Sequence, residues 1–312
     1  MDDGLEFGRS LSSPGVIFGS GNLDGSFSKS TSGNGIELGL RGKLRFGGGQ
    51  CAPDNTFNRV GNAGYNFPAG SCNGGNDMAA TWSYEFAINS DVGCDSVADG
   101  AECVPLNAYD YHISLDQDRS YCTDSNWTVT LPLPTGGSID LPGTGDPVNT
   151  IFDTVKPGNA LGTASTKQGG GGLPQCGDRS LEWMCDAGSS ACNVATDAGV
   201  EGLMQGGCLR NSTTTYEEGI GSLTVAQNSA QLSFFGGPPD YDIADTGIYT
   251  IKLAAKCKGT DLVITETYID VLVGNLATDF PTEASACEGG NFSFDGLFAS
   301  EEECKDFVSR YA

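Results

Sequence analysis

Apolar and polar residues alternate with a period of two along several parts of this chain, which is the pattern of strands with one buried face. The clearest example begins at Ile36 and ends at Phe46. One face of this segment carries Ile36, Leu38, Leu40, Leu44 and Phe46, and the other carries Glu37, Arg41, Lys43 and Arg45. We therefore expect a strand with one solvated side, as in an antiparallel sheet.

The same alternation recurs later in the chain, at residues 82–88, 109–115 and 127–133. The best hairpin joins a strand from Tyr249 to Ala255 to a strand that ends at Val273, through a Gly-containing turn at residues 258–261. Many strands, frequent Gly turns and few helical stretches predict a mostly β fold. We expect an antiparallel β-sandwich of the jelly-roll type, formed by residues 1–135 and 219–276.

The alternation weakens between these two halves. Residues 136–218 contain the glycine run 169–172 and four cysteines. A structureless loop of this length would be unusual in a compact domain. We expect a disulfide-rich, irregular insertion that bridges hold in shape.

The last segment, residues 277–312, has a helical pattern. Ser300 and Glu303 have capping-box spacing. The residues that then share one helical face are Cys304, Phe307, Val308 and Tyr311. A bridge from Cys287 to Cys304 would staple this short helix to its own loop and contribute roughly 3 kcal/mol in the chain-entropy model.

The chain has twelve cysteines and no C-x-x-C pair. They are Cys51, Cys72, Cys94, Cys103, Cys122, Cys176, Cys185, Cys192, Cys208, Cys257, Cys287 and Cys304. His112 is the single histidine, so zinc sites lack their usual ligands, and disulfides in an oxidising compartment are the economical interpretation. We expect all twelve to be bridged, with neighbours such as Cys51–Cys72, Cys94–Cys103 and Cys287–Cys304 as candidate pairs.

The formal net charge is -24, from forty acidic and sixteen basic residues. Nucleic acid is excluded as a partner, because phosphate binding needs clustered Lys and Arg. Membrane insertion is also excluded, because no apolar run has the length to span a bilayer. The first twenty residues lack the features of a signal peptide, so we expect a mature secreted chain.

Several segments resemble a family of secreted bacterial proteins of unknown function that often carry a PEP-CTERM-type sorting tail. They include ATWSYEFAINSD, YDYHISLDQD and GIYTIKLAAKCKGTDLVITETYIDVLVG, and together they cover about half the chain. This chain lacks the tail and is richer in cysteine than that family. Its ending, from Cys287 to Cys304, resembles a small two-Cys motif of other secreted bacterial proteins. The resemblance implies a secreted location and a β fold, and no catalytic residues.

Calcium is the best hypothesis for a bound cofactor, because hard cations bind carboxylate oxygens gathered by a bent loop. Candidate ligands follow one strand at Asp116, Asp118 and Ser120, and a second pair is Asp240 and Asp242. Neither group has EF-hand spacing. Simple solvation of acidic loops is the alternative.

Catalysis finds little support in the sequence. His112 lies on the polar face of its strand, and no G-x-S-x-G elbow is present. Aromatic residues that could stack on sugars, such as Trp82, Trp127 and the pair Tyr109 and Tyr111, fall on the face predicted to be buried. Trp183 in the insertion is less constrained.

These observations favour a non-enzymatic, secreted structural or adhesive protein of the cell surface or matrix. Its expected partners are other copies of itself, in fibres or layers formed by strand addition, or surface glycans. A carbohydrate-binding module is the first alternative. A calcium-dependent glycan hydrolase is the second, because the separation of two carboxylates cannot be read from a sequence.

Overall fold

The computed structural model describes residues 5–12, 25–44, 58–70 without 63, 80–93, 103–121 without 117 and 118, and 242–312 without 291–293 and 295. It also gives the backbone of strands β8 to β12. Of the predicted insertion, it describes only the three short strands β9 (Ser138–Asp140), β10 (Pro147–Asn149) and β11 (Ala160–Gly162).

Sheet A contains six strands in the order β1-β2-β3-β6-β12-β11, and every neighbouring pair is antiparallel. Besides β11, these are β1 (Leu5–Arg9), β2 (Phe27–Thr31), β3 (Glu37–Leu44), β6 (Trp82–Asn89) and β12 (Val225–Gln231). The strand predicted from residue 36 to residue 46 is thus confirmed as β3, up to the limit of the described residues.

Sheet B also contains six strands, in the order β4-β5-β14-β13-β7-β8. Its strands are β4 (Arg59–Val60), β5 (Gly64–Phe67), β14 (Val263–Val273), β13 (Gly247–Cys257), β7 (Tyr109–Asp116) and β8 (Trp127–Leu133). The pairing of β5 with β14 is parallel and the other pairings are antiparallel. The predicted hairpin is confirmed as β13 and β14, and β9 pairs separately with β10.

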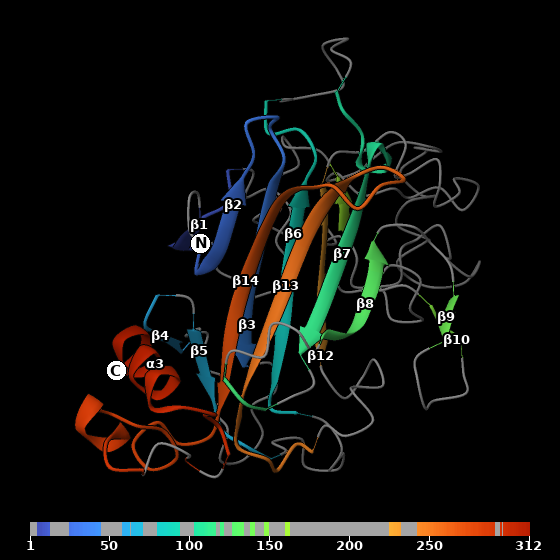
Figure 1. The fold of residues 1–312 in the computed structure, drawn as a ribbon. Coiled ribbons are helices and arrows are strands. Elements are labelled where there is room, and N and C mark those ends of the chain that lie inside the picture. The colour runs from blue at the N-terminus through green and yellow to red at the C-terminus, as the bar shows by residue number, and fades with distance from the viewer. Residues whose placement is uncertain are drawn as a thin grey trace, which may run out of the picture.

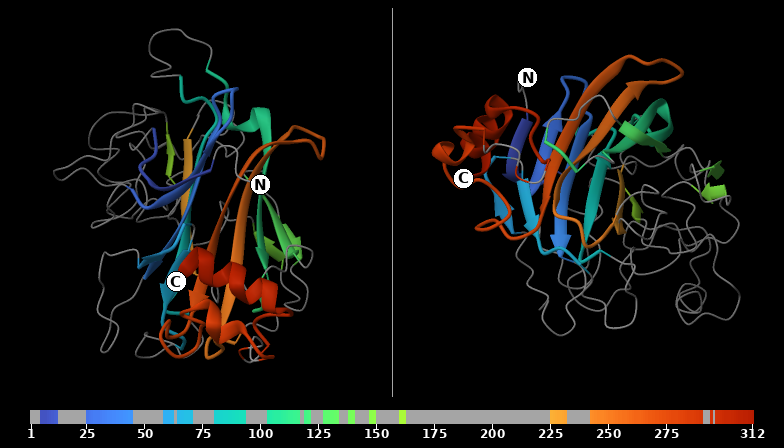
Figure 2. Two further views of the ribbon diagram at one scale, coloured as in Figure 1. Left: turned by 60° about the vertical axis from the view of Figure 1, so that its left-hand side comes forward. Right: turned by 60° about the horizontal axis from the view of Figure 1, so that its bottom comes forward.

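The two sheets form two layers that face each other (Figures 1 and 2). The predicted mostly β, antiparallel-rich architecture is therefore confirmed. Alternate residues of β3, β6, β7, β13 and β14 point into the space between the layers and form the main core. Within it, the Trp82 ring stacks on Phe67 with a centroid distance of 6.1 Å.

One part of the space between the layers is bridged by hydroxyl groups. Ser30 Oγ and Thr265 Oγ1 share a hydrogen bond of 2.7 Å, and Thr267 Oγ1 donates to the Ser28 carbonyl at 2.9 Å. All four side chains are buried. Because buried hydroxyls are costly without partners, these reciprocal bonds are what lets β2 and β14 pack together there.

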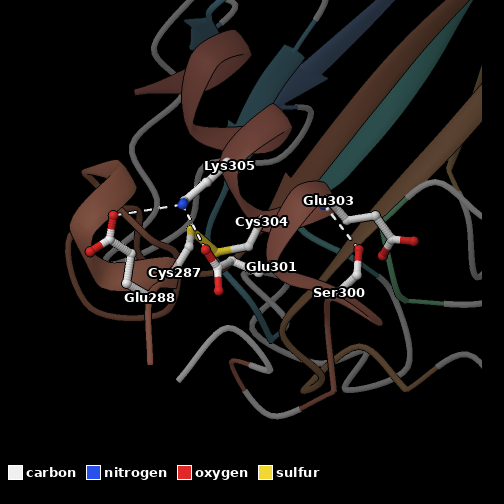
Figure 3. Close-up of a disulfide and its surroundings, with 7 residues drawn as sticks. All are labelled: Cys287, Glu288, Ser300, Glu301, Glu303, Cys304 and Lys305. Atoms are coloured by element: carbon white, nitrogen blue, oxygen red, sulfur yellow. Dashed lines mark hydrogen bonds and ion pairs between the residues drawn. A yellow bond between two sulfur atoms is a disulfide. The ribbon is translucent and has the colours of Figure 1, made fainter. Parts of the chain in front are cut away.

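The chain ends in helix α3 (Glu301–Tyr311), which follows the 3₁₀ turn η5 (Ala284–Cys287). A second 3₁₀ turn, η2 (Leu106–Ala108), precedes β7. Ser300 caps α3, since its hydroxyl accepts from the Glu303 N–H at 3.2 Å, as the capping-box spacing predicted. The predicted bridge between Cys287 and Cys304 is present and joins η5 to α3 (Figure 3).

We call residues 275–312 the C-terminal module. It packs against the outer face of sheet B, on the side away from sheet A (Figure 2). The second core formed there contains Tyr121, Ile248, Leu272, Phe280, Cys287, Leu297, Phe298, Cys304, Phe307 and Tyr311. The Tyr311 hydroxyl also donates to the buried Asp270 carboxylate of β14, which fixes the end of α3 on the sheet.

Candidate functional site

The polar face of β3, which the sequence predicted to be solvated, is buried. Glu37 is 2% exposed and Arg41 is 1% exposed. The covering residues include Phe27, whose ring lies 4.3 Å from the Arg41 guanidinium carbon, and Gly25, whose carbonyl accepts from Arg41 Nη1 at 2.9 Å. The expectation of a wet face was wrong because alternation shows which face of a strand is apolar and does not show which other segments of the chain cover the polar face.

This face carries paired charges, which we call the charged layer: Lys29, Glu37, Arg41, Lys43 and Glu85. Arg41 contacts one Glu85 oxygen through both Nε and Nη2, each at 2.6 Å, and Lys43 lies 3.3 Å from the other oxygen. Both oxygens of Glu37 accept from the Ser12 N–H, and Lys29 lies 3.4 Å away.

The electrostatics of the charged layer are clearest at Glu85, which lies between Arg41 and Lys43. Burial by itself raises the pKa of the Glu85 carboxyl, but Arg41 and Lys43 outweigh it, so the pKa lies below its ordinary value. A carboxylate held ionised by two cations is a poor proton donor or acceptor near neutral pH. The charged layer therefore joins β2, β3, β6 and the segment before β2, and its Glu85 carboxylate is held in the ionised form.

The predicted calcium ligands are only partly described. Asp118 and Asp240 lie outside the described residues, and of Asp116 only the backbone is described. Asp242 is exposed, and its Oδ1 accepts from the Ala244 N–H at 2.9 Å, as in an ordinary Asx turn. Ser120 is half-buried, beside Arg119, whose carbonyl accepts from the Ile248 N–H at 2.9 Å.

The segment after β7 is thus joined to the start of β13 through Arg119 and Ile248. Within the described ranges, no three His, Cys, Asp or Glu side chains come together as a metal site. Calcium binding stays a prediction.

The burial predicted for the aromatic residues is confirmed for Trp82 and Tyr111. Trp82 and Tyr111 are fully buried, and Tyr109 is half-buried with its ring edge against Tyr111. The side chain of Trp127 and all of Trp183 lie outside the described residues. The rings that are described contribute to the core rather than to an exposed sugar platform.

His112 lies on the outer face of sheet B and is half-buried. Its Nδ1 is buried and, in the described part of the chain, has no hydrogen-bond partner. Burial lowers the pKa of His112, and the nearby Lys256 lowers it further, while Asp110 and Asp261 oppose the shift. No serine or cysteine nucleophile is bonded to this ring within the described residues.

The cysteine prediction has a mixed outcome. Cys287–Cys304 is confirmed, and Cys103 is also disulfide-bonded. Cys257 carries a free thiol, so the expectation that all twelve are bridged was wrong for this position. Its register partner in β7 is Tyr109, and its backbone starts the turn that leads to Leu262, so the sheet places no cysteine opposite it. The other eight cysteines lie outside the described residues.

The exposed feature that sequence reasoning missed is the end of the β13–β14 hairpin, residues 256–263, which we call the hairpin tip. Leu262 is 66% exposed and Val263 is 43% exposed, and they are the exposed large hydrophobics of the described residues. Figure 2 shows the hairpin tip (orange) projecting on the side away from sheet A. The sequence signal was present, since two aliphatic residues directly follow a Gly-containing turn.

Comparisons with family models, with curated proteins and with solved structures found no match to this chain. In the part of the chain that the structure describes, no helix is long and apolar enough to span a membrane. The functional assignment therefore depends on the geometry above.

Proposed function

We propose that this chain is a non-catalytic extracellular protein with a structural or adhesive role. The observation that carries this proposal is how the buried carboxylates are used. Glu37, Glu85 and Asp270 each hold together two or more segments of the fold, through Ser12 and Lys29, through Arg41 and Lys43, and through Tyr311 and Thr250. Side chains committed in this way serve stability, and catalysis needs groups free to exchange protons.

The extracellular part of the proposal is supported by the bridged cysteines. Disulfides persist in oxidising compartments and are rare in the cytosol. Cys287 and Cys304 are both fully buried, as expected for a bridge whose role is to hold the C-terminal module together.

The geometry favours adhesion over fibres made by strand addition. The outermost described strands of the two sheets are β1, β11, β4 and β8. Of these, β1 has an irregular register between Phe7 and Arg9, β11 and β4 have three and two residues, and β8 contains Pro132, which cannot donate a hydrogen bond. Short, bulged or proline-containing edges discourage pairing with another chain.

The test is co-sedimentation of the purified, oxidised chain with envelope fragments of the cells that secrete it. We expect a saturable fraction to sediment with the fragments. Fragments pretreated with protease, and separately with periodate, distinguish a protein partner from a glycan partner. A chain that stays in the supernatant at every fragment concentration contradicts the adhesive proposal, and turnover of a glycan by the pure protein contradicts its non-catalytic part.

A further inference from the structure

The environment of His112 suits a neutral ring and opposes a charged one. The ring lies on the outer face of β7 and is half-buried, and its Nδ1 is buried without a hydrogen-bond partner among the described residues. A neutral imidazole carries a proton on one nitrogen only, whereas an imidazolium carries a proton on both. Protonation of His112 would therefore bury a positive charge and leave a buried N–H donor without an acceptor.

The charged groups around the ring do not reverse this preference. Asp110 Oδ2 accepts from the Gly259 N–H at 2.6 Å, and Asp261 lies 3.5 Å from Lys256. Burial and Lys256 outweigh the two carboxylates, so the pKa of His112 lies below its ordinary value. The charged or titratable residues at neighbouring positions of this face are Asp110 on β7, Lys252 and Lys256 on β13, Glu266 and Tyr268 on β14, and Lys258 and Asp261 in the hairpin tip, and the sequence of β8 contains none.

The strand beside His112 on one side is β8, at the edge of sheet B (Figure 1). It pairs only with β7, with Pro132 opposite His112 and an irregular register between Leu115 and Asp116. On the other side of His112, β13 is held between β7 and β14. An edge strand with one partner opens locally at a lower free-energy cost than a central strand, so local opening around His112 begins at β8.

We propose that β8 is an acid-sensitive edge strand, and that protonation of His112 releases it from β7. Release brings the charged ring into water, where its charge is hydrated and both N–H groups find acceptors. It also uncovers the outer backbone edge of β7, an eight-residue strand. The pH therefore determines which strand forms this edge of sheet B.

The direction follows from the linkage between proton binding and opening. In the open state the His112 pKa is the ordinary value near 6.5, and in the closed state it is lower. The open state binds more protons between these two pKa values, so opening becomes more favourable as the pH falls. From pH 7.5 to pH 5 the opening equilibrium can rise by at most about thirtyfold, the bound for one ordinary histidine.

The experiment is hydrogen exchange with mass spectrometry on the full, oxidised chain at pH 5 and pH 7.5, corrected for the intrinsic exchange rate at each pH. We expect peptides from β7 and β8 to lose protection severalfold at pH 5, within that bound, while peptides from β14 keep theirs. Because the chain has one histidine, a proton NMR titration reports its pKa directly, and we expect a value below 6.5.

Matched variants separate the ring from general acid sensitivity. His112→Gln keeps a polar side chain that does not titrate and should give equal protection of β8 at both pH values. Lys256→Gln removes a cation that opposes the charged ring, so the acid-induced loss should shrink. Lys252→Gln removes a cation from the same face of the same strand and should reduce that loss less.

Four results overturn the inference. They are equal corrected protection of β8 at the two pH values, the same acid-induced loss in His112→Gln, a loss that extends equally to β14, and a histidine that titrates at 6.5 or above. The first, third and fourth need no variant, so poor folding of His112→Gln does not remove the test. None of these measurements involves envelope fragments, so the adhesive proposal stands or falls separately.

Discussion

The outer faces of the two sheets are covered by different chemistry. On sheet A, the charged layer places Arg41 and Glu85 against each other beneath Phe27 and Gly25. On sheet B, the C-terminal module supplies an aromatic core around Phe307. Removing one member of a buried ion pair leaves the other charge buried without compensation and is strongly destabilising. Truncating a buried apolar side chain destabilises the fold in proportion to the contact that is removed.

The sharpest test of this comparison is Arg41→Ala. It leaves the Glu85 carboxylate buried with Lys43 as its remaining cation, and we expect a loss of about 3 to 5 kcal/mol in the free energy of unfolding. Denaturant unfolding followed by tryptophan fluorescence measures it. The double variant Arg41→Met with Glu85→Leu should recover much of the loss, because no charge then remains buried. A loss below about 1 kcal/mol for Arg41→Ala would falsify the idea that the pair is buried and coupled.

On sheet B, removal of the bridge with Cys287→Ser and Cys304→Ser is expected to destabilise the C-terminal module by roughly 3 kcal/mol, the chain-entropy value for a loop of this length. The module should then be cut by protease before the sandwich is. Cys257→Ser, which removes a free thiol, is the matched control and should leave the proteolysis pattern unchanged. Equal protease resistance in all three proteins would contradict the stapling role.

A smaller effect is expected from Tyr311→Phe, which keeps the ring and removes the hydroxyl that donates to Asp270. Hydrogen bonds to charged groups contribute about 2 kcal/mol. The loss should appear in hydrogen exchange of α3, with Ser309→Ala as a control on the same helix. Unchanged exchange of the α3 amides would show that the hydroxyl does not hold the helix down.

The smallest effect concerns His112, whose pKa is lowered in the folded chain by burial and by Lys256. The unfolded chain, with a histidine pKa near 6.5, therefore binds more protons between the folded and unfolded pKa values. The free energy of unfolding should rise with pH across that window and level off above about 6.5. Unfolding midpoints between pH 5 and pH 8 test this, and the His112→Gln variant should show a flatter profile. A midpoint that falls with rising pH in the native chain and not in the variant would reverse the sign.

Strands with an apolar face were predicted well from the sequence, and the segments that pack over the sheets were predicted poorly. Strand β6 and the β13–β14 hairpin follow directly from their alternation, and α3 follows from Ser300 and Glu303. Strand β2 was missed because its inner face carries the hydroxyls of Ser28 and Ser30 where alternation looks for aliphatic side chains. Their partners lie on β14, far away in the chain, so no local pattern contains them.

The hairpin tip was missed for a related reason. The turn at residues 258–261 was predicted, but exposure of Leu262 depends on where the neighbouring strands end. The free thiol of Cys257 likewise depends on its register partner in β7. Both are properties of the assembled sheet rather than of a sequence window.

The position at which α3 packs has a consequence for how the chain folds. A side chain at Gly61 would collide with the Arg310 carbonyl, and one at Gly64 would meet the Tyr311 ring. The last turn of α3 can therefore pack here only because residues 61 and 64 are glycines. Because this contact joins residues near Gly61 to residues near Tyr311, its loop-closure entropy is large, and we expect it to form late in folding.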